Sequence, residues 1–505
     1  MEGISELIRR HDEYQIEVKL DYDLHRTRRK ERYTVEYFFF LPENLDVNEA
    51  TYTKERFYRD MLLYLRFKAP DLSLDQLADV FDERSPLRKI REKLERFRQT
   101  PTSRNATVLD YELKLLACVL KDALAARLRA LERALGPTPD EEMADRFLAS
   151  FLEKTGAVTR NFRDFRREFE DPYLPISLRS AYAFVDEYVS LLVEGRAHLA
   201  LQTLQRSAAA GVKDRWTVKL ANLIRGELDH RRERGYPTLP EEGKDNELFI
   251  FRLGVLKKLT AGALYLSVRT EKEGRGIEQL GMALAAGLAM LFATTVAFIY
   301  QRAYGTLSVY FFSALIVSYM FKDRLKAMAQ GYFLRFRSER VMDLATDLTD
   351  PFTLEKIGGC RELVHFVPEN RVDPTVVRLR NRDHITEIEN SWRAEKVLHY
   401  VKEISLYPHR LDKQSRKTAL TDIARFNLRN FLLKMDESKK DLFLLRDGRS
   451  ETISGARVYH VNLVIKFSNL FRVRYERVRL VLDQNGIKRV EPVSVDLKSS
   501  DSAAS

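Results

Sequence analysis

A cysteine and a histidine that follow a pair of glycines are the residues of this sequence best suited to chemistry. The segment EKIGGCRELVHF holds Cys360 directly after the glycines and His365 five residues later. The glycines would let a substrate approach the backbone, and Arg361 would favour the thiolate of a nucleophilic cysteine. A buried structural cysteine is the commoner role, so Cys360 and His365 stand as weak catalytic candidates.

A second group of ionisable residues lies in RDHITEIENSWRAEKVLHYVKE. On one helix, residues three or four apart share a face, which pairs His384 with Glu387 and Glu395 with His399. The two histidines are 15 residues apart, about 22 Å along a straight helix, so one site cannot use both. We therefore expect a solvated helix with salt bridges, no metal site and no cofactor.

The motifs of the common enzyme classes are absent from the sequence. It contains no GxxxxGK[ST], GxGxxG, GxSxG, HExxH or EF-hand pattern. Its two cysteines, Cys118 and Cys360, are far apart, so no disulfide framework or zinc ribbon is expected and a reducing compartment fits. No recognisable catalytic motif supports an enzyme.

An apolar segment in the middle of the chain predicts membrane insertion. Gln279 to Gln301 contains no charged residue, and its 23 residues span about 34 Å as a helix, enough to cross a hydrocarbon core of about 30 Å. A second uncharged run, Ala303 to Phe321, has 19 residues and spans about 28 Å. A buried hairpin of a soluble domain would show a polar face. We therefore expect a transmembrane helical hairpin over 277–321 with a short loop over 301–306.

Basic residues flank this segment, whereas the loop holds only Arg302. The excess of Lys and Arg beside the two spans predicts that both termini are cytoplasmic and that the loop lies on the opposite side. The net charge of +11 also favours anionic lipids as partners. The residues expected to contact the membrane surface are Lys272, Arg275, Lys322, Arg324, Lys326, Arg335 and Arg337.

Small residues recur every four positions along the first span. Gly281, Ala285, Ala289 and Ala293 would let another helix approach closely. That helix is either the second span of the same chain or a span of a second copy, and the sequence leaves both open.

The flanking parts predict an α+β membrane protein. Alternation of apolar residues over 14–22 and 33–41 indicates an N-terminal β-hairpin, and a capping box of Ser73 and Gln76 marks one of several helices that follow. In the C-terminal part we expect helices near 390–403 and 415–435, then a three-stranded β-meander that the N-terminal hairpin extends. The expected domains are 1–45 (β-hairpin), 46–270 (helical, cytoplasmic), 277–321 (transmembrane hairpin), 322–348 (a basic juxtamembrane helix that lies on the membrane or continues the second span) and 349–505 (α+β, cytoplasmic).

Three functions remain open from the sequence. The favoured one is a membrane-anchored scaffold or regulatory protein that binds a protein partner, because the spans carry no ionisable side chain and much of the chain is soluble. An oligomeric pore or membrane-disrupting effector would line a channel with hydroxyl groups, and a membrane-bound enzyme would act on a lipid or another anionic substrate. Nucleic acid is not an expected partner, because the basic cluster over 24–32 lacks interleaved aromatic residues. The hydroxyl residues of the pore hypothesis are Thr294, Thr295, Ser308, Ser313 and Ser318.

Overall fold

The computed structural model divides the chain into two compact units that are not consecutive in sequence. Unit 1 combines residues 1–65, 266–413 and 421–505, and unit 2 combines 66–265 and 414–420. The N-terminal and C-terminal parts of the chain therefore fold together. The described residues are 8–25, 27–207, 210–273, 275–305, 308–338, 341–351, 354–381, 395–411, 419–469 and 472–493.

An eight-stranded antiparallel sheet forms most of unit 1. Its strand order is β14-β13-β12-β3-β8-β7-β6-β5, so β3 from the N-terminal part pairs with β12 and β8 from the C-terminal part. The predicted meander is confirmed, since β12, β13 and β14 are consecutive antiparallel neighbours. The strands are β3 (Glu31–Pro42), β5 (Ser267–Lys272), β6 (Leu344–Thr349), β7 (Lys356–Val367), β8 (Glu395–Leu406), β12 (Tyr459–Asn469), β13 (Val473–Asp483) and β14 (Gly486–Val493).

A four-stranded sheet packs on one face of this sheet. Its order is β1-β2-β9-β4, and rings such as Phe39 of β3 and Phe426 of β9, 5.0 Å apart, fill the space between the sheets. The opposite face of the large sheet is covered by α12, whose Val376 and Leu379 pack with Phe38 and Phe40 of β3. These elements are β1 (Ile8–Arg10), β2 (Gln15–Asp23), β4 (Met61–Phe67), β9 (Ala419–Asn427) and α12 (Pro374–Arg380), with the short helices η2 (Glu43–Leu45), α1 (Lys54–Asp60), η4 (Glu369–Arg371), η5 (Pro408–Arg410) and α14 (Arg429–Leu432).

The N-terminal strands are correctly predicted, but their pairing as a hairpin is wrong. β2 lies in the four-stranded sheet and β3 in the eight-stranded sheet. Both strands alternate in the way a hairpin requires, yet each finds a partner from the C-terminal part of the chain. The hypothesis that this region extends the meander holds for β3 alone, through its pairing with β12.

Two predicted C-terminal helices are wrong over most of their described residues, although the short helix α14 lies within the second. Residues 395–403 belong to β8 and residues 419–427 to β9. Each strand carries charged residues between its apolar ones and buries adjacent residues at its start, which interrupts the clean alternation of a half-exposed strand. In β8, for example, Val397 and Leu398 are both buried although they point to opposite faces.

Unit 2 is a helical assembly whose core is lined by α4, α5, α7, α8 and α9. The predicted capping box is confirmed. The side chain of Ser73 accepts a hydrogen bond from the backbone N–H of Gln76, and the side chain of Gln76 accepts one from the backbone N–H of Ser73. The stretch 46–270 is not purely helical, because it also contributes β4 and β5. The helices are α2 (Leu74–Ala78), α3 (Pro86–Gln99), α4 (Ser103–Ala134), α5 (Glu141–Arg163), α6 (Arg166–Phe169), α7 (Ile176–Arg206), α8 (Ala210–Glu233), α9 (Glu247–Ala261) and η3 (Gly262–Leu264).

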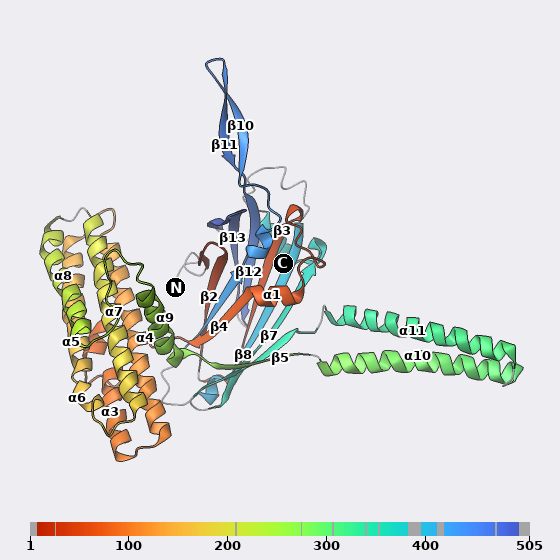
Figure 1. Ribbon diagram of the computed structural model, residues 1–505, viewed down its shortest axis with the longest axis horizontal. Coiled ribbons are helices and arrows are strands. Elements are labelled where there is room, and N and C mark those ends of the chain that lie inside the picture. Colours follow the sequence, from red (N-terminus) through yellow and green to blue (C-terminus); the bar gives the residue numbers. More distant parts are fainter. Residues whose placement is uncertain are drawn as a thin grey trace, which may run out of the picture. The chain divides into compact units, whose positions relative to one another are not determined.

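Two long helices and one β-ribbon complete unit 1. Helices α10 (Arg275–Tyr304) and α11 (Val309–Ser338) lie side by side along their length, and we call this pair the arm (Figure 1). The segment 322–348 holds no separate helix, since α11 continues to Ser338 and β6 begins at Leu344. Strands β10 (Lys439–Arg446) and β11 (Arg449–Ala456) pair only with each other among the described strands.

Candidate membrane-binding site

The arm exposes large apolar side chains along the whole of α10. Leu280, Leu288 and Phe298 are 62%, 59% and 70% exposed. Burial of one such side chain stabilises a structure by roughly 1.5–3 kcal/mol, so a helix that exposes many of them is unstable in water. Among the described residues, the part of α10 from Gln279 to Tyr304 is the one helix long and apolar enough to cross a membrane.

The small residues of α10 lie on the side of the helix that is covered. Gly281, Ala285 and Ala289 are buried and Ala293 is half-buried. Helix α11 is the element in extensive contact with α10, and its Ser318 is 5% exposed. The small residues therefore pack within the arm and leave the larger side chains of α10 on the outside.

Helix α11 is apolar over a shorter stretch than the sequence suggested. Ala303 and Tyr304 belong to α10, and Gly305 has a φ of 76° that favours glycine where α10 ends. The uncharged part of α11 then runs from Val309 to Phe321, 13 residues or about 20 Å. This length is too short to cross a hydrocarbon core of about 30 Å.

The charged residues after Phe321 lie beside the apolar part of α10. The rings of Tyr304 and Tyr310 are 5.3 Å apart and set the register of the two helices at the tip of the arm. Lys322 follows Tyr310 by 12 residues and Phe292 precedes Tyr304 by 12, so both lie about 18 Å from the tip. Lys322, Arg324 and Lys326 therefore lie far from the base of the arm, where Arg275, Arg335 and Arg337 lie.

Aromatic rings gather at the tip of the arm. The ring of Tyr304 also lies 5.8 Å from that of Tyr300, so three tyrosines cluster next to Arg302. Tyrosine and arginine suit a membrane–water interface, because the ring is amphipathic and the guanidinium reaches the headgroups. Two of the hydroxyl groups considered for a channel lining donate to carbonyls of their own helix, Thr294 to that of Met290 and Ser318 to that of Leu315.

The base of the arm is fixed by the sheet. Strand β5 precedes α10, strand β6 follows α11, and the two strands pair antiparallel with Lys272 opposite Leu344. Glu273 donates its backbone N–H to the carbonyl of Asp343 at 3.1 Å. Asp343 is held in turn by Lys54 and Tyr58 of α1, at 2.8 and 3.0 Å. Both ends of the arm are thus held at one edge of the large sheet.

The two weak catalytic candidates lie on opposite faces of β7. Cys360 faces the four-stranded sheet and is 2% exposed, and burial raises the pKa of its thiol. His365 pairs with His399 on the other face, with ring centroids 5.3 Å apart. Gly358, beside them in sequence, serves packing, because a Cβ there would lie 2.6 Å from the carbonyl oxygen of Ser405. The structure does not bring Cys360 and His365 together.

The space between the two sheets contains a buried ion pair that sequence reasoning missed. The Nζ of Lys402 lies 2.8 and 2.7 Å from the carboxylate oxygens of Asp422, and Tyr22 donates to the same carboxylate at 3.0 Å. Burial lowers the pKa of Lys402, but the neighbouring carboxylate of Asp422 outweighs this effect and holds the pKa of Lys402 above its usual value. The sequence signal that could have found this pair is Lys402 itself, a lysine at a position of β8 where the alternation places a buried side chain.

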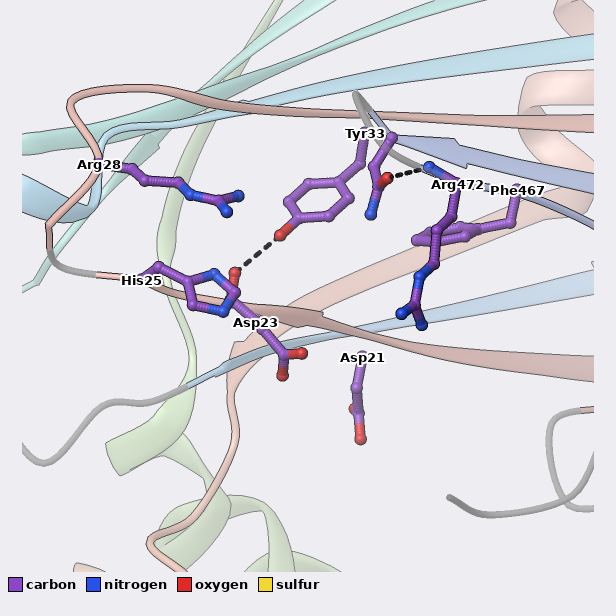
Figure 2. Close-up of a pocket in the computed structure, with 8 residues that line it drawn as sticks. Asp21, Asp23, His25, Arg28, Tyr33, Phe467 and Arg472 are labelled. Carbon is purple, nitrogen blue, oxygen red and sulfur yellow. Dashed lines mark hydrogen bonds between the residues drawn. The ribbon is translucent and has the colours of Figure 1, made fainter.

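A hollow of about 410 Å³ lies at the ends of β2 and β12 (Figure 2). Its histidine and one of its arginines are already bound, because the Nδ1 of His25 lies 2.7 Å and the Nη1 of Arg28 3.3 Å from one oxygen of Glu31. The lining residues are Asp21, Asp23, His25, Arg28, Tyr33, Phe467, Asn469 and Arg472.

The residues considered for a metal site do not form one where the structure describes them. His384 and Glu387 lie outside the described residues. Glu395 and His399 lie on β8, where Glu395 binds Arg380 and His399 binds Glu36. Within the described ranges, no three histidine, cysteine or acidic side chains are arranged to hold a metal ion.

The ribbon of β10 and β11 is a second exposed apolar feature. Asp447 and Gly448 have φ values of 50° and 76°, which fit a tight hairpin turn. Phe443 and Leu445 on β10 are 78% and 76% exposed. Isolated two-stranded hairpins are marginal in water, so a ribbon with exposed apolar residues gains stability from a partner.

Comparisons with known proteins identify no relative of this chain. The chain matches no family model, no curated protein and no solved structure.

Proposed function

We propose that this chain is a membrane-anchored scaffold or regulatory protein. The arm is the anchor, both folded units lie on the cytoplasmic side, and their surfaces bind a protein partner. The exposed ribbon of β10 and β11 supports a protein partner.

The observation that carries the proposal is the pairing of β5 with β6 at the base of an arm that contains an apolar helix. When α10 crosses a bilayer, its C-terminal end reaches the opposite side. Strand β6 must nevertheless pair with β5, so α11 has to return across the same bilayer. The proposal is therefore two spans, with the tip near Arg302 on the far side.

Basic charge supports the cytoplasmic orientation. Lys272, Arg275, Arg335 and Arg337 lie at or near the base of the arm, where anionic headgroups of the cytoplasmic leaflet would meet them. Arg302 is the one basic residue near the tip.

Labelling of one introduced cysteine at a time tests the anchor. The native Cys118 and Cys360 are 8% and 2% exposed, so an impermeant maleimide will react with an introduced cysteine first. We expect the Tyr304→Cys variant at the tip to be labelled from outside intact cells. The matched Phe443→Cys variant on the ribbon should be labelled only after the membrane is opened, and both variants should resist extraction with alkaline carbonate.

Two results would contradict the anchor. Release of the protein by carbonate would show that the arm does not insert. Labelling of both variants from the same side would show that the tip does not cross.

Paired substitutions on the ribbon test the partner. We expect Phe443→Asp with Leu445→Asp to abolish stoichiometric co-purification of a cytoplasmic protein while the chain stays in the membrane. Leu442→Asp with Leu444→Asp, on the opposite face of the same strand and also exposed, is the matched control. A wild-type particle that contains no second protein would contradict the scaffold function.

A further inference from the structure

We propose that α11 pairs with α11 of a second copy of this chain inside the membrane. The contact uses one side of the helix, formed by Tyr319, Lys322, Asp323, Lys326 and Gln330, which we call the polar side. This inference rests on the proposed anchoring by the arm and names the partner of that same site.

The two helices of the arm favour different depths of insertion into the membrane. The apolar stretch of α10 is as long as the full hydrocarbon core, and the tyrosines and Arg302 at the tip suit the far interface. A shallow insertion to the depth of Phe321 would leave Leu280, Leu284 and Leu288 in water and Arg302 within the hydrocarbon. The length of α10 therefore favours full insertion.

Full insertion brings the polar side of α11 into the hydrocarbon. Lys322 and Lys326 lie about 18 and 24 Å from the tip, which is about 12 and 6 Å inside the cytoplasmic boundary of a 30 Å core. Long basic side chains can reach headgroups from the shallower depth, but the short side chain of Asp323 cannot. Charged residues at such depths in membrane proteins face other protein segments or water and pair with one another.

Among the described residues of one chain, the charges on the polar side have no such cover. Asp323 and Lys326 are exposed, and no ion pair joins either of them to another described residue. Lys322 lies 3.7 Å from the centre of the Tyr319 ring, a contact that leaves its charge without a carboxylate. Helix α10 covers the side of α11 that holds Ser318, so it does not cover Asp323.

A second copy supplies the missing partners by charge complementarity. In a two-fold pair of parallel α11 helices, each Asp323 lies within one turn of Lys322 and Lys326 of the partner helix. The carboxylate of each chain then neutralises lysines of the other, while the large apolar side chains of α10 remain in contact with lipid. This arrangement keeps the apolar side chains of α10 in lipid and pairs the charges of α11.

Disulfide cross-linking in liposomes at high lipid-to-protein ratio tests the contact with the full-length protein. Tyr319 and Asp323 are four residues apart and share a face, whereas Val317 points about 160° away from Tyr319 and is 50% exposed. We expect oxidation to cross-link the Tyr319→Cys variant between copies and to leave the Val317→Cys variant monomeric.

Charge substitution in the Tyr319→Cys background adds a second readout. Asp323→Lys should lower the cross-linked fraction about tenfold. Combining Asp323→Lys with Lys322→Asp and Lys326→Asp exchanges the charges and should restore the cross-link. A merely local helix defect would not be rescued by this exchange.

Three results separate the possible failures. Liposome flotation of a strictly monomeric protein would overturn the pairing and leave the anchor intact. Cross-linking of the Val317→Cys variant instead would overturn the assignment of the polar side. Failure of the wild-type protein to float would overturn the anchor itself, and this inference with it.

Discussion

His365 is a half-buried histidine whose environment opposes its protonation. Burial, the neighbouring His399 and then Lys54 lower its pKa to about 4, while Asp343 acts weakly in the other direction. An unfolded histidine titrates near 6.5. Between about pH 4 and 6.5 the unfolded chain therefore binds a proton that the folded chain does not bind, so the stability of unit 1 falls as the pH is lowered through this window.

Replacement of this side chain should flatten the pH dependence. We expect His365→Gln to reduce the slope of the unfolding free energy between pH 4 and 6.5 by at most about 1.4 kcal/mol per pH unit. Hydrogen exchange of β7 and β8 in the detergent-solubilised protein measures this slope. The exposed His409→Gln is the control, and an unchanged slope in the His365 variant would refute the assignment.

The same residue shows why the catalytic prediction from sequence could not be complete. His365 follows Cys360 by an odd number of positions, which in a strand sends the two side chains to opposite faces. Both are weak candidates close together in sequence, but only the assignment of the segment to a strand reveals that their side chains lie apart.

At the scale of elements, the ion pair of Lys402 and Asp422 joins β8 of one sheet to β9 of the other. Removal of one partner leaves an unpaired buried charge, so we expect Lys402→Met to destabilise unit 1 by about 3–5 kcal/mol. The double variant with Asp422→Leu should recover part of this loss, although Tyr22 then loses its acceptor.

Urea unfolding followed by protease resistance of β8 and β9 measures these effects. Lys396→Met, on the same strand but exposed, should change the free energy of unfolding by less than about 0.5 kcal/mol. Equal effects of Lys402→Met and Lys396→Met would mean that the buried pair contributes nothing specific.

Helix α11 shows a limit of hydropathy at the same scale. The uncharged run after Arg302 was long enough for a span, but part of it belongs to the end of α10 and to the turn. Counting uncharged residues cannot locate a turn whose flanks are equally apolar. The register of Tyr304 and Tyr310 then places Lys322 and Asp323 inside the proposed membrane rather than at its surface.

At the scale of the whole molecule, the arm is an insertion between two paired strands. Because the backbones of Glu273 and Asp343 are joined by a hydrogen bond, a tight turn can replace all the residues between them. We expect a chain in which residues 274–342 are replaced by Asn-Gly to be soluble without detergent and to retain both sheets.

Circular dichroism and the sedimentation of this shortened chain check the expectation. Insolubility or loss of β structure would show that the arm is required for the fold of unit 1. A soluble, folded chain that no longer associates with membranes would support the arm as the anchor.

The sequence by itself determined the features that depend on local pattern. Apolar length identified α10, alternation identified β2, β3 and the meander, and Ser73 with Gln76 identified a helix start, because each signal lies within about 20 consecutive residues. The tertiary structure decided the pairing of β3 with β12 and β8, the separation of Cys360 from His365, the burial of Lys402 against Asp422, and the closure of β5 on β6. Except for Cys360 and His365, which lie five residues apart on one strand, these features join residues about 20 to several hundred positions apart. A strand's alternation specifies which face it buries but not which strand it pairs with.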